Sequence, residues 1–202
     1  MAFTRLICTG LTVLLFSPSL LSQRSNESDY FRSPLDIPLY LSGNFGELRS
    51  THFHAGLDFK TQAVVGKNVY AVADGYVSRI KVQSGGYGKA IYVSHPNGMT
   101  SVYAHLFSYN KAIESFVEDY QYRNQTFEFD LYLEKDQLTL TKGEILGLSG
   151  NSGSSSGPHL HFEIRKTVSQ RPVNGLLYNF DIRDNIKPSI RGLAIYPMDE
   201  NS

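Results

Sequence analysis

Short apolar stretches separated by turn-forming residues characterise the chain from Pro38 onward. Residues 69–80, 90–94, 99–106 and 144–148 are rich in aliphatic and aromatic side chains, which favours strands. Asp74-Gly75 divides the first stretch into two predicted strands, and the turn sequences SGGYG and PNG precede the next two. This pattern predicts a mainly β fold built from antiparallel sheets.

The hydrophobic period changes between residues 108 and 141. Four apolar residues recur there at helical spacing: Ile113, Phe116, Val117 and Tyr120. Residues 127–133 then alternate apolar and mostly acidic side chains, which predicts a strand with an acidic outer face. We therefore expect a short, helix-containing insert at 108–141, a candidate lid or specificity element. The glycine- and serine-rich residues 149–157 are expected to form a loop.

The first 22 residues have the features of a secretory signal peptide. Arg5 precedes an apolar run at 6–16, which is too short to span a bilayer, and small residues follow. We expect cleavage, which would leave no membrane span; an anchor that stays attached is the alternative. A polar segment follows at 23–37. The tail at 167–202 ends on an apolar stretch and could begin a further β module.

Composition narrows the classes of partner and cofactor. The 202-residue chain is 41% hydrophobic and 19% charged, as expected for a globular domain. Its 19 basic residues balance 19 acidic ones, so we expect no nucleic-acid partner. The single cysteine, Cys8, lies within the signal sequence, so cleavage would remove the only thiol. Any transition-metal site would then use histidine, aspartate and glutamate.

Two histidine clusters carry candidate chemistry. In a strand, His159 and His161 point to the same face about 7 Å apart, where they could serve a metal, a proton relay or neither. His54 and Asp58 would lie about 13 Å apart in a straight strand. A bend at Ala55-Gly56 would bring them together, because glycine bends at little cost.

His54, Asp58 and one histidine of the later pair would form a three-ligand site with a fourth position open to water. Zinc suits this nitrogen and oxygen donor set, and it would lower the pKa of the bound water. The other histidine of the pair could accept the proton of that water. Of the remaining histidines, we expect His52 at the surface and His95 to be structural or exposed.

Three segments in the same order resemble the lysostaphin-type (LytM-like) zinc endopeptidases that act on peptidoglycan. They are HFHAGLD at 52–58, GYGKAIYVSHPNGMTSVYAHL at 86–106 and GEILGLSGNSGSSSGPHLHFEIR at 143–165. The resemblance covers about 38–166, the expected peptidase domain, and implies a duplicated hybrid motif, a lipoyl-like barrel-sandwich of antiparallel strands.

The resemblance also implies roles for individual residues. Matching positions make His54, Asp58 and His161 ligands of one zinc ion, with His159 and His105 completing the active site. Some members have an upstream tyrosine that holds the reacting carbonyl, and Tyr40 is a weak candidate for that role here.

The expected function is hydrolysis of peptide cross-links in peptidoglycan by an exported zinc endopeptidase, with zinc-bound water as nucleophile. Its expected location is the periplasm or cell envelope of a bacterium, and its expected partner is the peptide of the wall. The alternative is a catalytically inactive wall-binding or amidase-activating module of the same fold. Glycine bridges and D-alanyl cross-links to a diamino acid both remain open as the bond cut.

Overall fold

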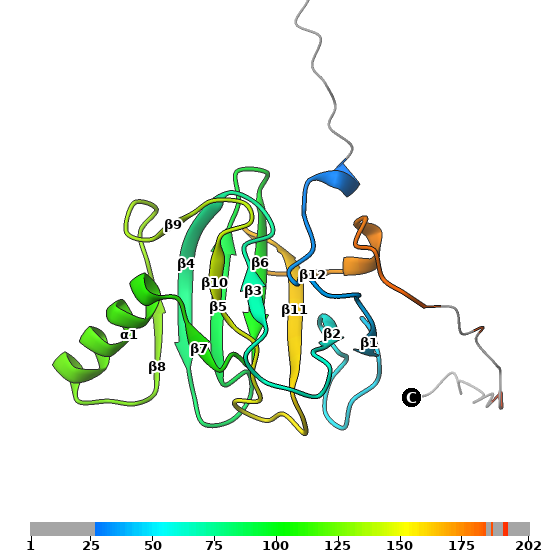
Figure 1. Ribbon diagram of the computed structural model, residues 1–202, viewed down its shortest axis with the longest axis horizontal. Coiled ribbons are helices and arrows are strands. Elements are labelled where there is room, and N and C mark those ends of the chain that lie inside the picture. Colours follow the sequence, from blue (N-terminus) through cyan, green and yellow to red (C-terminus); the bar gives the residue numbers. More distant parts are fainter. Residues whose placement is uncertain (1–26, 185–186, 188–191, 194–202) are drawn as a thin grey trace, which may run out of the picture.

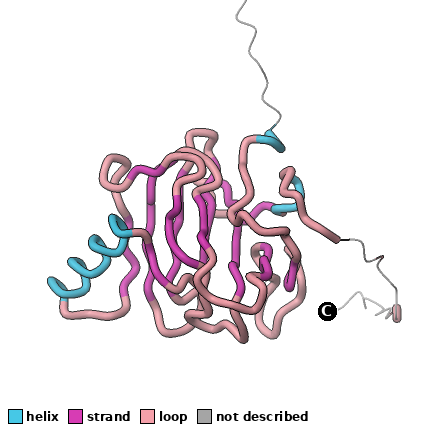
Figure 2. The backbone as a smooth tube through the Cα atoms, in the orientation of Figure 1, coloured by secondary structure: helices cyan, strands magenta, loops and turns pink. Residues whose placement is uncertain are grey.

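The part of the chain that the structure describes contains two antiparallel β-sheets and one α-helix. Figure 2 shows the strands of this part in magenta and its helical segments in cyan. The computed structural model describes residues 27–184, 187 and 192–193. The mainly β class predicted from the hydrophobic pattern is confirmed, including the helix within the insert. The signal sequence expected at 1–22 and most of the apolar stretch at 192–196 lie outside the described residues.

The larger sheet has nine strands, with β1-β2-β11-β6-β5-β4-β8 in order, β12 beside β11 and β9 beside β4. Its strands are β1 (Leu41–Gly43), β2 (Leu57–Lys60), β4 (Gly75–Val82), β5 (Lys89–Ser94), β6 (Met99–Ala104), β8 (Phe129–Tyr132), β9 (Thr139–Leu140), β11 (His159–Lys166) and β12 (Pro172–Val173). Strand β11 pairs with both β2 and β6, so the last sequence motif lies between the first and second motifs (Figure 1).

The smaller sheet has the order β3-β10-β7 and crosses in front of the larger one in Figure 1. Its strands are β3 (Asn68–Tyr70), β7 (Ser108–Tyr109) and β10 (Ile145–Leu148). Val69 and Leu146 are fully buried in the same hydrophobic cluster as Leu160, Phe162 and Ile164 of β11. The core therefore lies between the two sheets.

Side chains along β11 alternate between the hydrophobic core and the face that carries the candidate site residues. Leu160, Phe162 and Ile164 enter the core, and since successive side chains point to opposite faces, His159, His161 and Glu163 share the other face. A second, small cluster of buried residues lies apart from the main core: Ala90, Tyr92, Val102 and Ala104, with Tyr87 packed against it.

The insert joins both sheets. Helix α1 (Lys111–Asn124) starts at Asn110, whose side chain accepts a hydrogen bond from the Ile113 amide. Of the predicted helical stripe, Ile113 and Val117 are buried, and the two aromatic residues pack against the core. Phe127 is 64% exposed, contrary to the predicted alternation, because β4 ends at Val82 opposite Phe129 and offers no strand partner further on.

The packed structure extends beyond the expected limits of 38 and 166. Phe31 and Leu35 precede that range and Phe180 follows it, yet all three belong to the main core. The two flanks also contact each other, since Leu39 forms a parallel bridge with Ile182. Two 3₁₀ helices lie in these flanks, Glu27–Asp29 and Gly175–Leu177. Part of the segment expected to be polar is therefore structural.

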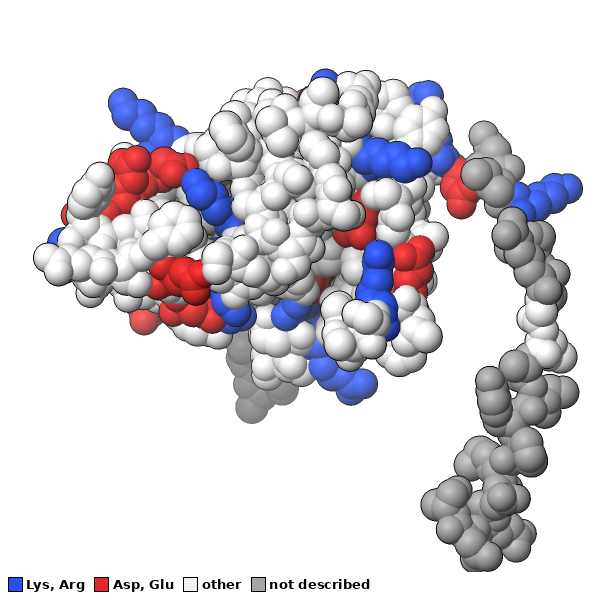
Figure 3. All heavy atoms as spheres, turned by 90° about the horizontal axis from the view of Figure 1, so that it is seen from below, with Lys and Arg blue, Asp and Glu red and all other residues white. Residues whose placement is uncertain are grey.

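Acidic side chains gather at the end of the molecule that carries α1 (Figure 3). Two of the acidic groups at that end form ion pairs with the large sheet, Asp130 with Arg79 and Glu114 with Lys89. None of the described helices is long and apolar enough to cross a bilayer.

Candidate active site

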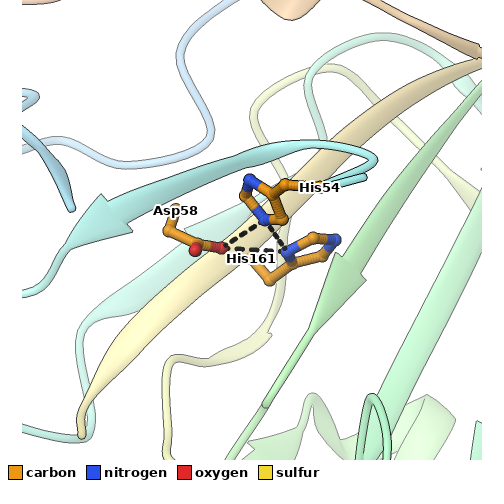
Figure 4. A group of neighbouring side chains, drawn as sticks. All are labelled: His54, Asp58 and His161. Atoms are coloured by element: carbon orange, nitrogen blue, oxygen red, sulfur yellow. Dashed lines mark hydrogen bonds and ion pairs between the residues drawn. The ribbon is translucent and has the colours of Figure 1, made fainter. Parts of the chain in front are cut away.

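His54, Asp58 and His161 meet on the face of the large sheet opposite the core (Figure 4). The Asp58 Oδ1 atom lies 2.9 Å from His161 Nδ1 and 3.1 Å from His54 Nε2, and the two nitrogens are 3.0 Å apart. All three residues are buried. The structure thus brings together the three residues for which the sequence predicts a metal site.

The predicted bend before β2 brings His54 to Asp58. Gly56 lies against β11, where a Cβ atom on it would be 2.3 Å from the Phe162 carbonyl oxygen. Only glycine fits so close to another backbone. The chain straightens into β2 at Leu57, and the pairing of Asp58 with His161 across β2 and β11 completes the cluster.

Hydrogen bonds to the outer side of each imidazole determine which nitrogen faces the cluster. His54 Nδ1 lies 2.7 Å from the Asn44 carbonyl oxygen, and His161 Nε2 lies 2.8 Å from a Glu163 carboxylate oxygen. Both partners accept hydrogen bonds, so these nitrogens carry the hydrogens. When such a ring is neutral, its other nitrogen directs a lone pair toward Asp58.

The donor set fits a metal ion. Two imidazole nitrogens and one carboxylate oxygen lie 2.9–3.1 Å from one another. Their lone pairs repel one another unless a cation or a proton lies between these atoms. Ligands of a tetrahedral zinc ion with bonds of about 2.0–2.1 Å lie about 3.3–3.4 Å from one another, close to these spacings. Zinc bound by two histidines and a carboxylate keeps a further position open.

Arg49 holds the second oxygen of Asp58. Its Nη2 atom lies 3.2 Å from Asp58 Oδ2 and 3.1 Å from Glu47. The two carboxylate oxygens therefore have separate partners, the histidines at Oδ1 and the guanidinium at Oδ2. This division fixes the rotation of the Asp58 carboxylate.

His105 and His159 flank the cluster. His105, at the end of β6, has a φ of 58° and donates from Nδ1 to the Ser152 carbonyl oxygen at 2.8 Å. His159 donates from Nδ1 to the Gly157 carbonyl oxygen at 2.8 Å. The two ring centroids are 4.8 Å apart. In both rings a backbone carbonyl thus occupies Nδ1, which leaves Nε2 for other partners, and His159 Nε2 lies 3.5 Å from Asp58 Oδ1.

The pKa values of the ionisable side chains in the site are shifted in different directions. Burial would raise the pKa of Asp58, but hydrogen bonds with His159, His161 and His54 hold it far below its usual value. Burial lowers the pKa of His105 to about 4. Although burial also disfavours protonation of His161, hydrogen bonds with Asp58 and Glu163 raise its pKa to about 9 in the metal-free protein. A proton can therefore occupy the cluster where a metal ion would otherwise lie.

These residues line a cavity of about 570 Å³. Its lining includes all five predicted site residues, together with Arg49, Lys60 and Tyr87. Residues of the 108–141 insert do not line this cavity, so the idea that the insert forms a lid is not supported. Tyr40 is also outside the lining, and the tyrosine that does line the cavity is Tyr87.

Sequence reasoning missed several groups that surround the cluster. The place of Glu163 could have been predicted, because it follows His161 by two positions in a strand and so lies on the same face. Arg49, Asn44 and Ser152 lie in loops and gave no periodic signal. Of the other histidines, His52 is exposed as expected, and His95 is buried between Asp74 and Ser101, a structural role.

Comparison with known proteins identifies the family of the chain. The family model "Peptidase family M23" matches residues 52–122 and 127–175, which is more than half of the chain. The matched ranges contain all five predicted site residues. The chain belongs to peptidase family M23.

Two curated relatives have related names. The DD-carboxypeptidase/endopeptidase Mpg of Neisseria meningitidis is 33% identical over 127 residues, covering 63% of this chain and 23% of the relative. The peptidoglycan DD-endopeptidase ShyA of Vibrio cholerae is 28% identical over 163 residues, covering 77% of this chain and 31% of the relative. The chain thus spans less than a third of the length of either relative.

Solved structures share the fold. Helicobacter pylori Csd3 is 28% identical with a TM-score of 0.51, over 82% of this chain and 36% of that one. A zinc-containing peptidase from Vibrio cholerae has a TM-score of 0.55 at 22% identity, over 76% of this chain and 41% of that one. These similarities agree with the mainly β architecture described above.

Proposed function

We propose that this protein is a zinc-dependent endopeptidase that hydrolyses peptide cross-links in bacterial peptidoglycan. The observation that carries the proposal is the convergence of His54, Asp58 and His161, with their lone pairs directed at one point. Membership of a peptidase family and the names of the relatives support the same activity.

His54 Nε2, Asp58 Oδ1 and His161 Nδ1 would hold the zinc ion. When bound there, zinc supplies a Lewis acid that lowers the pKa of water and polarises a peptide carbonyl. The protein fixes the three donors beforehand through the Asn44 carbonyl, Arg49 and Glu163. Such outer contacts maintain ligand orientation in metal sites.

His105 and His159 would handle protons and developing charge. Each donates from Nδ1 to a backbone carbonyl, so each presents Nε2 to the cavity. A neutral Nε2 can accept the proton of an attacking water, and the resulting imidazolium can return it to the leaving amine. Their rings are close enough together, at 4.8 Å between centroids, to act on the same substrate bond.

The D-alanyl cross-link to a diamino acid is the bond we propose. Both relatives described above carry "DD" in their names, and this supports cleavage between D-centres rather than in a glycine bridge.

Export to the periplasm or cell envelope is part of the proposal, because peptidoglycan lies outside the cytoplasmic membrane. Residues 1–22, with the features of a signal peptide, support that location.

A catalytically inactive wall-binding module is the alternative, and the intact set of five site residues argues against it. Incubation of the zinc-loaded protein with purified peptidoglycan separates the two. The enzyme should release soluble peptides, and His161→Ala should not. Binding of the wall without release, at full zinc occupancy, would favour the inactive module.

A further inference from the structure

Glu163 is a buried carboxylate in direct contact with a proposed metal ligand. It is 1% exposed, and its Oε1 atom accepts a hydrogen bond from His161 Nε2 at 2.8 Å. A charge in such a place needs partners. Arg165 Nε donates to Oε2 at 2.6 Å, and the Tyr87 hydroxyl donates to Oε1. We call Glu163, Arg165 and Tyr87 the support cluster.

The support cluster favours an ionised Glu163 that accepts the hydrogen bond from His161. The Arg165 guanidinium lies 2.6 Å from Glu163 Oε2, and a neighbouring positive charge favours the ionised carboxylate. An ionised carboxylate only accepts hydrogen bonds, so the His161 hydrogen stays on Nε2. His161 would have the opposite tautomer, with its lone pair turned away from Asp58, if Glu163 did not accept this hydrogen.

Tyr87 connects the support cluster to the other side of the cavity. Its ring lies against the His161 ring, with centroids 5.0 Å apart and planes inclined by 33°. Its backbone carbonyl accepts a hydrogen bond from the His105 amide at 2.9 Å. Tyr87 therefore limits the rotation of His161 and lies beside the backbone of His105.

Stabilisation of the fold alone does not explain a buried ion pair at Glu163 and Arg165. Replacing a buried ion pair with apolar side chains of similar volume is often neutral or stabilising. The neighbouring cluster of Ala90, Tyr92, Val102 and Ala104 shows that this face of the sheet can be packed with apolar groups. The contact between Glu163 and His161 gives the ion pair a purpose at the metal site.

We propose that Glu163, supported by Arg165 and Tyr87, is a positioning group that fixes His161 as an Nδ1 metal ligand. This inference rests on the zinc role proposed above. Glu163 does not touch the substrate. It keeps the hydrogen on Nε2, orients the ring and increases the affinity of the site for zinc, as carboxylates behind histidine ligands do.

Competition between the protein and a chromophoric chelator measures the zinc affinity of each variant. Glu163→Gln should bind zinc about 10–100-fold more weakly than the unmodified protein. Tyr87→Phe removes one hydroxyl and should weaken binding in the same direction by a smaller factor. Glu118→Gln, an exposed change on α1, is the matched control and should leave the affinity unchanged. A folded Glu163→Gln protein with unaltered zinc affinity would overturn the inference.

A second variant covers the case in which Glu163→Gln does not fold because Arg165 loses its partner. Glu163→Leu combined with Arg165→Met removes both charges and should show the same loss of zinc affinity. Unchanged affinity in this double variant would also contradict a positioning role.

Nitrogen NMR of the histidine rings tests the tautomer without any substitution. In the zinc-loaded protein, the His161 hydrogen should be on Nε2, and a hydrogen on Nδ1 would contradict the inference. Absence of any measurable zinc binding by the unmodified protein would instead overturn the proposed function. The two failures are therefore distinguishable.

Discussion

The Asp58 Oδ1 atom lies 2.9 Å from His161 Nδ1 because the two residues are paired across β2 and β11. Two sequence motifs that are 103 residues apart thus share one pair of hydrogen-bonded strands. Backbone pairing sets the spacing of two donors, and the bend at Gly56 adds His54 as the third.

Loss of any one of the three donors should remove both zinc and activity. Alanine at His54, Asp58 or His161 leaves only two protein ligands, whereas a catalytic zinc ion is usually held by three. Plasma mass spectrometry of the purified variants, together with peptide release, measures both properties. Near-stoichiometric zinc in any of the three would show that the ligand set is different.

Alanine at His105 or His159 should have a different effect. Neither residue is needed to hold the ion, so zinc content should remain near that of the unmodified protein. Turnover should fall by about 10²–10⁴-fold, the usual contribution of an acid or base group. If His159→Ala loses its zinc while His161→Ala retains it, the roles of these two histidines are reversed.

The pH dependence should reflect His159 rather than His105. Burial lowers the pKa of His105 to about 4, so that ring stays neutral between about pH 5 and 7. Burial opposes protonation of His159 too, but its hydrogen bond with Asp58 raises its pKa above the usual value. A raised pKa means that His159 gains its proton first as the pH falls, so kcat/KM should decrease on the acid side.

The His105→Ala variant tests this assignment through the shape of its pH profile. Its rate should be lower at every pH, with the acid limb at the same position as in the unmodified protein. An acid limb that disappears in His105→Ala would assign the limb to His105 instead.

Gly56→Ala should damage the site through the backbone. A Cβ atom there would lie 2.3 Å from the Phe162 carbonyl oxygen, so β2 or β11 must shift. We expect a loss of about 1–3 kcal/mol in the free energy of unfolding, as for other overpacked positions, and weaker zinc binding. Gly85→Ala is the control, since its Cβ would make only an ordinary contact of 3.7 Å with Ser154. Equal thermal stability of both variants would contradict the close approach.

The flanks should be needed for stability. Phe31 is 3% exposed and its ring contacts the rings of Tyr30, His95 and Tyr178. Phe31→Ala should lower the free energy of unfolding by about 3–5 kcal/mol. Phe127→Ala, at a side chain that is 64% exposed, should have little effect in the same denaturant titration. A small effect at Phe31 would support a domain that begins at residue 38.

The parts of the fold that the sequence predicted are those with a regular pattern. The strands 90–94 and 99–106 with the turn between them, and the helical stripe around Ile113, follow periods that a single sequence displays. Phe31 and Leu35 lie among polar residues and prolines, so their burial depends on tertiary contacts that no local period reveals.

The same distinction holds for the site. His54, Asp58 and His161 belong to short motifs whose residue types suggest metal binding, and a glycine between the first two indicated the bend. Arg49 and Tyr87 come from loops, and their contacts with Asp58 and Glu163 depend on how distant segments pack. Loop contacts of this kind become visible only in three dimensions.

The most direct test uses a defined dimer of muropeptides joined by a D-alanyl cross-link to a diamino acid. Mass spectrometry should show that the zinc-loaded protein converts the dimer into two monomers with the gain of one water. A chelator should stop this conversion, and added zinc should restore it. An intact dimer after incubation with the fully zinc-loaded protein would contradict the proposed function.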